Sequence, residues 1–335
     1  MVSLKDIAAK CGVSVATVSK ALNDHNDVGA KTKEQIRTVA REMGYFPNSS
    51  ARALKTNRTY NIGVLFVDEA QSGLTHDYFA HVLDSFKKTV EAAGYDITFI
   101  SSSRSSHMSY LEHSHYRGVD GVVIACVDFY DPQIMELIHS DLPVITIDHV
   151  FDYRIAVLSD NIQGMHDLVE YVYSKGHRRI AYIAGDDTSV TKNRLGSFYR
   201  SLEKKGIEVP DEYVLHSTYR NPEGAYKHTM NLLSLSERPT CIMYPDDFSA
   251  VGGINAIKDS GLDIPKDISV VGYDGSYISQ IISPRLTTLR QDTDSIGRVA
   301  AEKLIHLIEN PKTTLIQRMV IDGTLEEGGS VGEAG

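Results

Sequence analysis

The sequence has only three cysteines and no run of eighteen apolar residues. An odd, sparse cysteine count without paired spacing is typical of reduced thiols. Cys11, Cys126 and Cys241 each stand in an apolar context, so we expect three buried small hydrophobic side chains. Without a long apolar run nothing is predicted to span a membrane. The first residues, MVSLKDIAAK, also lack the apolar stretch of a signal peptide. We therefore expect a cytoplasmic protein that contacts no membrane.

Catalytic and metal-binding motifs are equally scarce. No glycine-rich loop of the P-loop type occurs. The hydroxyl groups around Ser189 and Thr191 have no base nearby with which to form a catalytic set. Three histidines, at 107, 113 and 115, invite a metal interpretation, but His113 and His115 share a face only in a strand. Their segment looks helical or looped, so the sequence predicts no enzyme, no cofactor and no metal site.

Charge is unevenly distributed along the 335 residues, whose formal net charge is −10. Residues 1–60 hold ten Lys and Arg against five Asp and Glu, a net charge of +5, whereas the remainder carries −15. The overall balance argues against nucleic acid, but a basic end on an acidic body confines phosphate affinity to that end. The length suits two or three domains.

The stretch from Leu4 to Asn23 predicts two short helices joined by a tight turn at Cys11-Gly12-Val13. Ser3 and Ser14 stand where each helix would begin, and serine is a favoured N-cap. Apolar residues at helical spacing supply a small core, namely Ile7, Ala8, Val13, Val18 and Leu22. This spacing is typical of a helix-turn-helix, whose second helix lies in the DNA major groove. The alternative is an ordinary helical hairpin.

A third helix is expected from Lys31 to Met43 and ends at Gly44, which completes a helix-turn-helix domain at residues 1–46. Beyond it, residues 47–60 contain a segment, Ser49 to Leu54, long enough for less than two turns of helix. A helix this short is unstable alone in water. We interpret it as a hinge that folds against DNA and a partner; a plain flexible linker is the alternative.

From residue 61 the pattern becomes α/β. Strands are expected at 61–67, 96–101, 119–127 and 142–150, and again at 178–186, 213–219, 241–246 and 268–275. Helices are expected at 78–94, 132–141, 194–205 and 291–310, with a last strand at 317–325. Strands that alternate with helices predict parallel sheets covered on both faces. Ligands of such sheets bind at the carboxyl ends of the strands, here between two facing subdomains.

We predict the fold class to be an all-α helix-turn-helix headpiece plus an α/β periplasmic-binding-protein-like core of two doubly wound parallel-sheet subdomains. The core spans 61–325. The first subdomain comprises about 61–159 and 291–318, and the second comprises about 160–290 and 319–325. Residues 326–335 are Gly-rich and are expected to form a flexible tail. Because the tail carries no apolar heptads, a coiled-coil tetramer is not expected.

The sequence resembles the Lac repressor/galactose repressor family of bacterial transcription regulators over roughly residues 3–325. The motifs that carry this resemblance are Val13-Ser14…Thr17-Val18-Ser19, Gly44-Tyr45-x-Pro47-Asn48-x-x-Ala51-Arg52-x-Leu54, Gly176-His177-Arg178-Arg179-Ile180-Ala181, Gly272-Tyr273-Asp274 and Pro284-x-Leu286-Thr287-Thr288. The resemblance implies a homodimer that binds a palindromic operator in double-stranded DNA. It also implies that a small molecule in the cleft changes the DNA affinity.

The family's DNA-binding roles carry over to ten positions. Val15 and Ala16 begin the recognition helix and would contact thymine methyl groups, while Lys20 would reach a base edge or a phosphate. The hydroxyl groups of Ser3, Thr17 and Ser19 would donate hydrogen bonds to phosphate oxygens of the DNA backbone. Leu54 matches the family's minor-groove wedge, which partly unstacks a central step. The full predicted set is Ser3, Ser14, Val15, Ala16, Thr17, Ser19, Lys20, Asn48, Ala51 and Leu54. Gly29 departs from the family's usual serine cap.

Seven residues are predicted to contact the effector, from their places at strand ends and helix starts. They are Tyr78, Phe79, Asp148, Arg194, Tyr219, Asp246 and Asp274. Carboxylates and a guanidinium can bind adjacent hydroxyl groups in pairs, and aromatic rings pack on the apolar face of a sugar. Asp247 is expected to be a helix cap instead.

Two departures from the family favour a neutral sugar or glycoside as effector. Asp246 replaces a common Asn and makes the expected pocket more acidic. Thr188 stands where the purine-binding member has a second Arg. We expect a repressor of carbohydrate-utilisation genes whose effector releases DNA, as in sugar-responsive relatives. The alternative is a bilobal sugar-binding transport protein, which the headpiece and the missing secretion signal disfavour.

Overall fold

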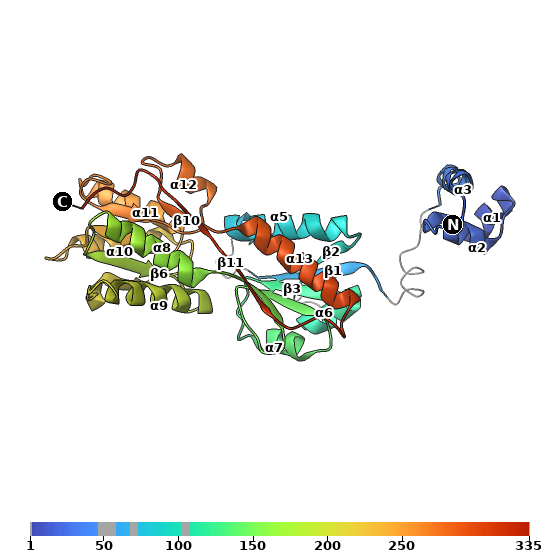
Figure 1. The fold of residues 1–335 in the computed structure, drawn as a ribbon, viewed down its shortest axis with the longest axis horizontal. Coiled ribbons are helices and arrows are strands. Elements are labelled where there is room, and N and C mark those ends of the chain that lie inside the picture. The colour runs from blue at the N-terminus through green and yellow to red at the C-terminus, as the bar shows by residue number, and fades with distance from the viewer. Residues whose placement is uncertain (1, 46–57, 68–72, 102–107, 335) are drawn as a thin grey trace. The chain divides into compact units, whose positions relative to one another are not determined.

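The computed structural model describes residues 2–45, 58–67, 73–101 and 108–334 (Figure 1). The chain divides into two compact units, Met1–Thr59 and Tyr60–Gly335. Our fold-class prediction is confirmed: a helical headpiece precedes an α/β core whose two subdomains each hold a parallel sheet. The predicted hinge, with Asn48, Ala51 and Leu54, lies outside the described residues.

The headpiece consists of three helices, α1 (Leu4–Cys11), α2 (Val15–Leu22) and α3 (Ala30–Glu42). Helix α1 ends at Gly12, whose left-handed backbone (φ 65°) turns the chain towards α2. Ser14 begins α2 by accepting a 3.0 Å hydrogen bond from the Thr17 amide. The three helices bury a small core of Ile7, Ala8, Val18, Ala21, Val28, Ile36 and Ala40. Gly29 precedes α3 and offers no side chain to cap it.

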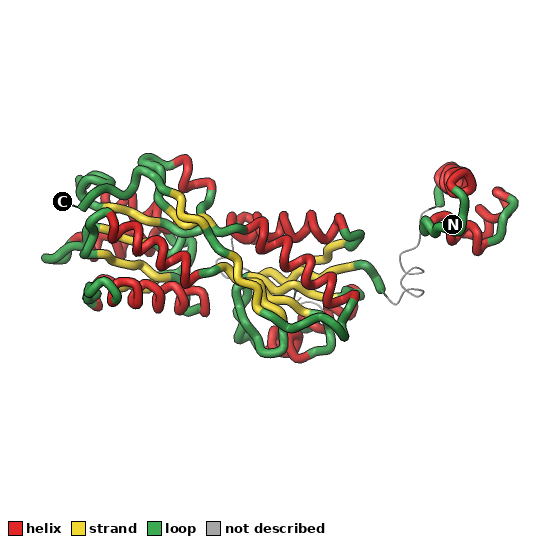
Figure 2. The backbone as a smooth tube through the Cα atoms, in the orientation of Figure 1, coloured by secondary structure: helices red, strands yellow, loops and turns green. Residues whose placement is uncertain are grey.

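The first subdomain is built on a six-stranded parallel sheet with the strand order β11-β5-β4-β3-β1-β2. Figure 2 shows its strands between helices. The strands are β1 (Asn61–Phe66), β2 (Asp96–Ile100), β3 (Gly121–Ala125), β4 (Val144–Ile147), β5 (Ile155–Ser159) and β11 (Arg318–Ile321). One face packs on α5 (Asp77–Ala92) and α13 (Thr293–Glu309), and the other on α6 (Tyr110–Arg117) and α7 (Pro132–His139). A short 3-10 turn, η1 (Gly73–Thr75), precedes α5.

The second subdomain repeats this design around a smaller parallel sheet with the strand order β7-β6-β8-β9. Its strands are β6 (Ile180–Ala184), β7 (Val214–His216), β8 (Cys241–Met243) and β9 (Ser269–Val271). Helices α8 (Asn161–Ser174) and α9 (Ser189–Glu203) cover one face, and α10 (Pro222–Leu233) and α11 (Asp247–Asp259) cover the other. The remaining elements are η2 (Asp211–Tyr213), α12 (Tyr277–Ile281) and an antiparallel pair, β10 (Thr288–Arg290) and β12 (Thr324–Glu326).

The structure corrects two expectations about the core and adds two elements to it. We assigned 319–325 to the second subdomain, but β11 pairs with β5 through Ile321, so the chain returns to the second subdomain only between β11 and β12. Arg194 lies in the second turn of α9 and does not begin that helix, because Thr188 is its N-cap. Helix α8 and strand β5 were not anticipated.

The expected flexible tail, residues 326–335, is instead packed on the second subdomain as far as it is described. Ser330 is fully buried; its Oγ donates to the Val270 carbonyl and accepts a hydrogen bond from the Thr287 amide. Gly328 approaches the backbone of Arg285 so closely that a Cβ there would lie 2.3 Å from the carbonyl oxygen. The glycine-rich composition predicted flexibility, whereas Gly328 permits a close backbone contact.

Candidate functional site

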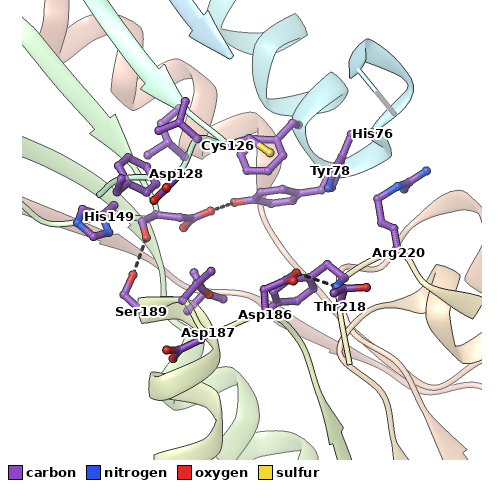
Figure 3. Close-up of a pocket in the computed structure, with 18 of the residues that line it drawn as sticks. His76, Tyr78, Cys126, Asp128, His149, Asp186, Asp187, Ser189, Thr218 and Arg220 are labelled. Carbon is purple, nitrogen blue, oxygen red and sulfur yellow. Dashed lines mark hydrogen bonds between the residues drawn. The ribbon is translucent and has the colours of Figure 1, made fainter. Parts of the chain in front are cut away.

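A cleft of about 720 Å³ opens between the two subdomains. Its walls are the segments that follow strands β1, β3, β4, β6, β7 and β9, together with the start of α5. The carboxyl ends of both parallel sheets therefore face this cleft, as expected for open α/β sheets. Figure 3 shows side chains from both subdomains directed towards one another across it. Six of the seven predicted effector residues line the cleft, namely Tyr78, Phe79, Asp148, Arg194, Tyr219 and Asp274.

Arg194 is buried on the second-subdomain side and is held rigidly. Its Nε donates to Asn161 Oδ1 at 2.7 Å and its Nη1 donates to the Pro245 carbonyl at 2.9 Å. The guanidinium also lies over the Tyr273 ring, 3.5 Å from its centroid, in a cation–π contact. These bonds leave Nη2 as the one guanidinium nitrogen without a hydrogen bond to the described residues. The arrangement presents a fixed, permanently charged donor group at the cleft.

Asp274 follows β9 with a left-handed backbone (φ 101°), which aims its carboxylate at the cleft. Gln291 Nε2 donates a 2.6 Å hydrogen bond to its Oδ1. Burial raises the pKa of Asp274 to about 7, even though the positive charge of Arg194 acts in the opposite direction. This carboxyl group therefore exchanges its proton near neutral pH.

Asp148 occupies the corresponding place after β4 in the first subdomain, also with a positive φ of 59°. Its Oδ2 accepts a 2.6 Å hydrogen bond from the Tyr78 hydroxyl, drawn in Figure 3, and its Oδ1 accepts one from the Ser159 amide at 3.1 Å. Burial raises the pKa of Asp148 and, more strongly, the pKa of Tyr78. The pair fixes the orientation of the phenol ring at the cleft wall.

Tyr219 is positioned by the loop that follows β7. Its hydroxyl lies 2.8 Å from Thr191 Oγ1, and its amide donates to Asp186 Oδ2 at 2.9 Å. Gly185 makes room for the ring, because a Cβ there would lie 2.5 Å from the ring atoms. Phe79 packs edge-on against Tyr78, with the ring centroids 4.8 Å apart. Two aromatic faces thus accompany the charged groups.

Within the described residues, three hydrogen bonds join the two subdomains at or near the cleft. Ser189 Oγ donates to the Asp148 carbonyl at 3.3 Å, as Figure 3 shows. Arg220 Nη2 donates to the Thr75 carbonyl at 3.5 Å, and the Tyr277 amide donates to Asp77 Oδ2 at 3.4 Å. All three are long, so each is a weak contact that a modest change in subdomain arrangement would break.

Asp246 does not have the position that we predicted for it as an effector-binding residue. It is the N-cap of α11 and does not line the cleft: its Oδ1 accepts from the Ser249 amide, and its Oδ2 accepts from Ser249 Oγ and the Arg220 amide. Asp247, expected to be the cap, is fully buried and accepts hydrogen bonds from Thr288 Oγ1 and the Ser276 amide. An extended backbone at Asp246 (φ −156°) directs its side chain over the helix start, which the sequence alone does not reveal.

Sequence reasoning missed one wall of the cleft. Phe129, Tyr130 and His149 line it from the loops after β3 and β4. The Phe129 and His149 rings stack with centroids 4.1 Å apart and an interplanar angle of 8°. The aromatic run Phe129-Tyr130 after a predicted strand was the available signal. Cys126 also lines the cleft and is only half-buried, as is Cys11, so of the three cysteines only Cys241 is fully buried.

The headpiece residues assigned to DNA cluster on α2 and at the starts of α1 and α2. Val15, Ala16 and Lys20 are exposed, as a base-reading face requires, and Val15 is 40% exposed. Ser14 Oγ caps α2 and lies 2.8 Å from Thr17 Oγ1. Ser3 Oγ donates to Asp6 Oδ2 at 2.8 Å. Ser19 is half-buried. Lys20 also forms an ion pair with Asp27.

His113 Nδ1 lies 2.8 Å from the Ser101 carbonyl and its Nε2 accepts from Arg117 Nε at 3.1 Å, and no group of possible metal ligands occurs in the part of the chain that the structure describes. A search of the same residues for helices long and apolar enough to cross a bilayer finds none.

Two family models match the chain. Residues 3–48 match the model of bacterial regulatory proteins of the lacI family, and residues 169–331 match the periplasmic binding protein-like domain. The first range contains the three headpiece helices. The second contains most of the second subdomain together with α13 and β11.

Curated relatives and solved structures agree over nearly the full length. The HTH-type transcriptional repressor PurR of Pectobacterium carotovorum is 29% identical over 342 residues, covering 96% of this chain and 98% of the relative. PurR of Escherichia coli is 28% identical over 319 residues, covering 93% and 92%. A crystal structure of the Lac repressor dimer bound to operator and the anti-inducer ONPF superposes with a TM-score of 0.82 at 26% identity, covering 99% of each chain.

Proposed function

Because the chain belongs to the Lac repressor/galactose repressor family of bacterial transcriptional regulators, we propose that it represses carbohydrate-utilisation genes from a palindromic operator. It acts in the cytoplasm as a homodimer, and a small neutral sugar or glycoside that enters the cleft releases it from DNA. The observation that carries the effector class is the cleft itself, in which a rigid guanidinium, hydrogen-bonding carboxyl groups and aromatic rings meet.

The headpiece supports the DNA-binding part of this proposal. Its recognition helix exposes two small apolar side chains, Val15 and Ala16, which suit contact with thymine methyl groups. The first sixty residues carry a net charge of +5, which favours phosphate contacts. The Lac repressor structure mentioned above is, by its description, a dimer on an operator. Two headpieces related by a dimer axis match the two half-sites of a palindrome.

The charge of the cleft supports a neutral effector. Five lining carboxyl groups, Asp128, Asp148, Asp186, Asp187 and Asp274, stand against the guanidinium groups of Arg194 and Arg220. An anionic ligand would be repelled by this excess of negative charge. Sugar hydroxyl groups, by contrast, can donate to carboxylate oxygens and accept from Arg194.

The residue at position 188 argues against a purine as the effector, because the purine-binding member of the family has a second Arg there. Thr188 holds this position, and its hydroxyl accepts the Thr191 amide hydrogen at 3.2 Å as the cap of α9. A small capping hydroxyl cannot supply the paired donors of a guanidinium. The bilobal transport-protein alternative is disfavoured by the headpiece, because such a protein has no use for a helix-turn-helix.

Release follows from differential affinity for two subdomain arrangements. The three long hydrogen bonds between the subdomains hold them together only weakly, so a ligand that contacts both sides of the cleft selects one relative arrangement. A ligand shifts such an equilibrium only by the difference in its affinity for the two states. Contacts to Asp148 on one side and to Arg194 and Asp274 on the other supply that difference.

Two measurements test the proposal. Isothermal titration of the full chain with a sugar panel and with hypoxanthine should give heat on a sugar; heat on hypoxanthine alone would refute the effector class. Fluorescence anisotropy with palindromic duplexes should show binding that weakens steeply as salt rises. The sugar found by titration should weaken operator binding. No binding to any palindromic duplex at low ionic strength would refute the repressor function.

A further inference from the structure

The missed aromatic wall of the cleft suggests a more specific effector. We propose that Phe129, Tyr130 and His149 form a subsite for the second ring of a disaccharide or aryl glycoside, so that the effector is a glycoside and not a free monosaccharide. This inference rests on the proposed function, because it assigns the part of the ligand that extends beyond the first sugar.

The three rings form a continuous apolar surface, which we call the aromatic platform. His149 stacks on Phe129, and the His149 and Tyr130 rings meet edge-to-face with centroids 6.4 Å apart. Phe151 lies behind them, 4.6 Å from His149, and does not line the cleft. Burial lowers the pKa of His149, so its ring is uncharged at neutral pH. An uncharged surface of rings, supported by Phe151, can stack against the flat face of another ring.

The solvent exposure of the aromatic platform indicates that a ligand covers it. Tyr130 is 74% exposed although it lines a cleft, which leaves a large apolar ring in water. Ligand sites commonly gain affinity by covering such surface. A single exposed aromatic residue is unremarkable. Here, however, the ring belongs to a cluster whose other members already form a cleft wall.

The size and layout of the cleft also exceed the needs of one sugar. A volume of about 720 Å³ lies in the upper part of the range of sites that enclose drug-sized ligands, which are considerably larger than a hexose. In Figure 3, His149 and Asp128 lie at one end of the cleft, whereas His76 and Arg220 lie at the other end, with the Tyr78–Asp148 hydrogen bond between them. A first ring held near Asp148 therefore leaves the platform for a second.

The charges around the platform restrict the second ring. Asp128 and Asp187 are exposed and line the same cleft, and Figure 3 shows them towards the end of the cleft where His149 lies. Their carboxylates can accept hydrogen bonds from hydroxyl groups and would repel a phosphate or a uronic acid. The subsite therefore takes a neutral ring, either a sugar or an aryl group.

Isothermal titration of the full-length dimer with matched ligands tests the subsite. The probes are the methyl glycoside of whichever sugar gives heat, its phenyl glycoside, and disaccharides that begin with it. We expect the phenyl glycoside or a disaccharide to bind at least about tenfold more tightly than the methyl glycoside, as expected for one added ring contact. Equal affinities for all three would overturn the inference and leave the proposed sugar effector intact. Absence of heat with every sugar would instead refute the proposed function.

Two variants locate the gain on the platform. Tyr130→Ala removes an exposed ring that the fold does not need, and Phe129→Ala removes a stacked one. Both should reduce the preference for the larger ligand to less than about threefold while the affinity for the methyl glycoside stays within about twofold. Tyr116→Ala is the matched control, since this tyrosine on α6 is 70% exposed and does not line the cleft. An unchanged preference in both platform variants would place the second ring elsewhere and overturn the subsite.

Discussion

Carboxylates in the two units of the chain lie in opposite environments. In the headpiece, Asp24 and Asp27 are exposed, and hydrogen bonds from Lys33 and Lys20 lower their pKa values. In the cleft, burial raises the pKa values of Asp148 and Asp274. Asp24 and Asp27 thus stay charged near neutral pH, whereas Asp274, whose pKa is raised to about 7, gains or loses its proton there. We therefore expect DNA contacts to respond mainly to salt, and the cleft to respond to pH.

The two units also differ in the size of their cores, which gives the largest expected effect. The headpiece core consists of a few side chains around Ile7, whereas the second unit has extensive cores on both faces of each sheet. Ile7→Ala should cost the headpiece about 2–5 kcal/mol, enough to unfold so small a unit. DNA binding by anisotropy should be lost, while sugar binding and the thermal transition of the second unit should remain.

Leu315→Ala is the control for that experiment, because Leu315 is 76% exposed in the second unit. It should change neither DNA binding nor stability. If Ile7→Ala also lowers the melting temperature of the second unit, the two units are not independent and the comparison between them fails.

Arg194→Met gives the next largest effect and tests the cleft side. The substitution leaves Asn161 Oδ1 and the Pro245 carbonyl without their donor in a buried place. Each unsatisfied buried group costs about 1–3 kcal/mol, so with two such groups urea denaturation should show a loss of about 2–6 kcal/mol. Titration should show at least about a hundredfold weaker sugar binding.

Arg200→Met is the matched control on the same helix, because Arg200 is exposed. Its stability and sugar affinity should equal those of the unaltered chain. Normal sugar affinity in Arg194→Met would remove this guanidinium from the effector site, whatever happened to stability.

Periodicity predicted most of the fold because burial imposes it. Strand β1 was expected at 61–67 and is found at Asn61–Phe66, and α5 was expected at 78–94 and is found at Asp77–Ala92. Strand β5 escaped notice because its flanking turn follows β4 closely and no helix separates the two strands. The prediction of a flexible tail was wrong because a high glycine content does not reveal whether another backbone segment packs closely against those glycines.

The sequence predicted those residues of the cleft that follow the ends of strands. Asp148 and Asp274 each follow a strand and have a positive φ, so their approach to the cleft follows from topology. Asp246 and Asp247 stand together at the start of α11, and only the backbone conformation decides which one caps it. The aromatic platform was missed because it joins two loops, which carry no periodicity that would reveal their contact.

Asp274→Asn tests the pH side of the comparison. A carboxyl group whose pKa rises to about 7 on folding binds more protons in the folded state than in the unfolded one between about pH 4 and 7. Stability from this group is therefore present at low pH and lost as pH rises through 7. Asn keeps the neutral form and can still accept from Gln291. The variant should be more stable than the unaltered chain at pH 8, and this advantage should shrink towards pH 5.

Melting temperatures of both chains from pH 5 to 9 measure this difference. Asp148 keeps a smaller pH dependence in the variant, because its pKa is also raised. Parallel profiles for Asp274→Asn and the unaltered chain would show that Asp274 is ionised throughout and would break the contrast with the headpiece.

Asp27→Asn sharpens the comparison from the headpiece side and has the smallest expected effect. Asp27 pairs with Lys20, and both side chains are about half exposed, 54% and 48%. An exposed pair adds little to folding, so the stability of the headpiece should not change measurably.

The substitution frees Lys20 for DNA and removes a negative charge beside the recognition helix. Operator affinity by anisotropy should therefore rise a few-fold at low salt, and the gain should fade at high salt, where exposed charges are screened. The gain should be the same at pH 6 and pH 8, because the pKa of Asp27 is lowered and its carboxylate stays charged there. A pH-dependent gain would erase the distinction between the two sets of carboxylates.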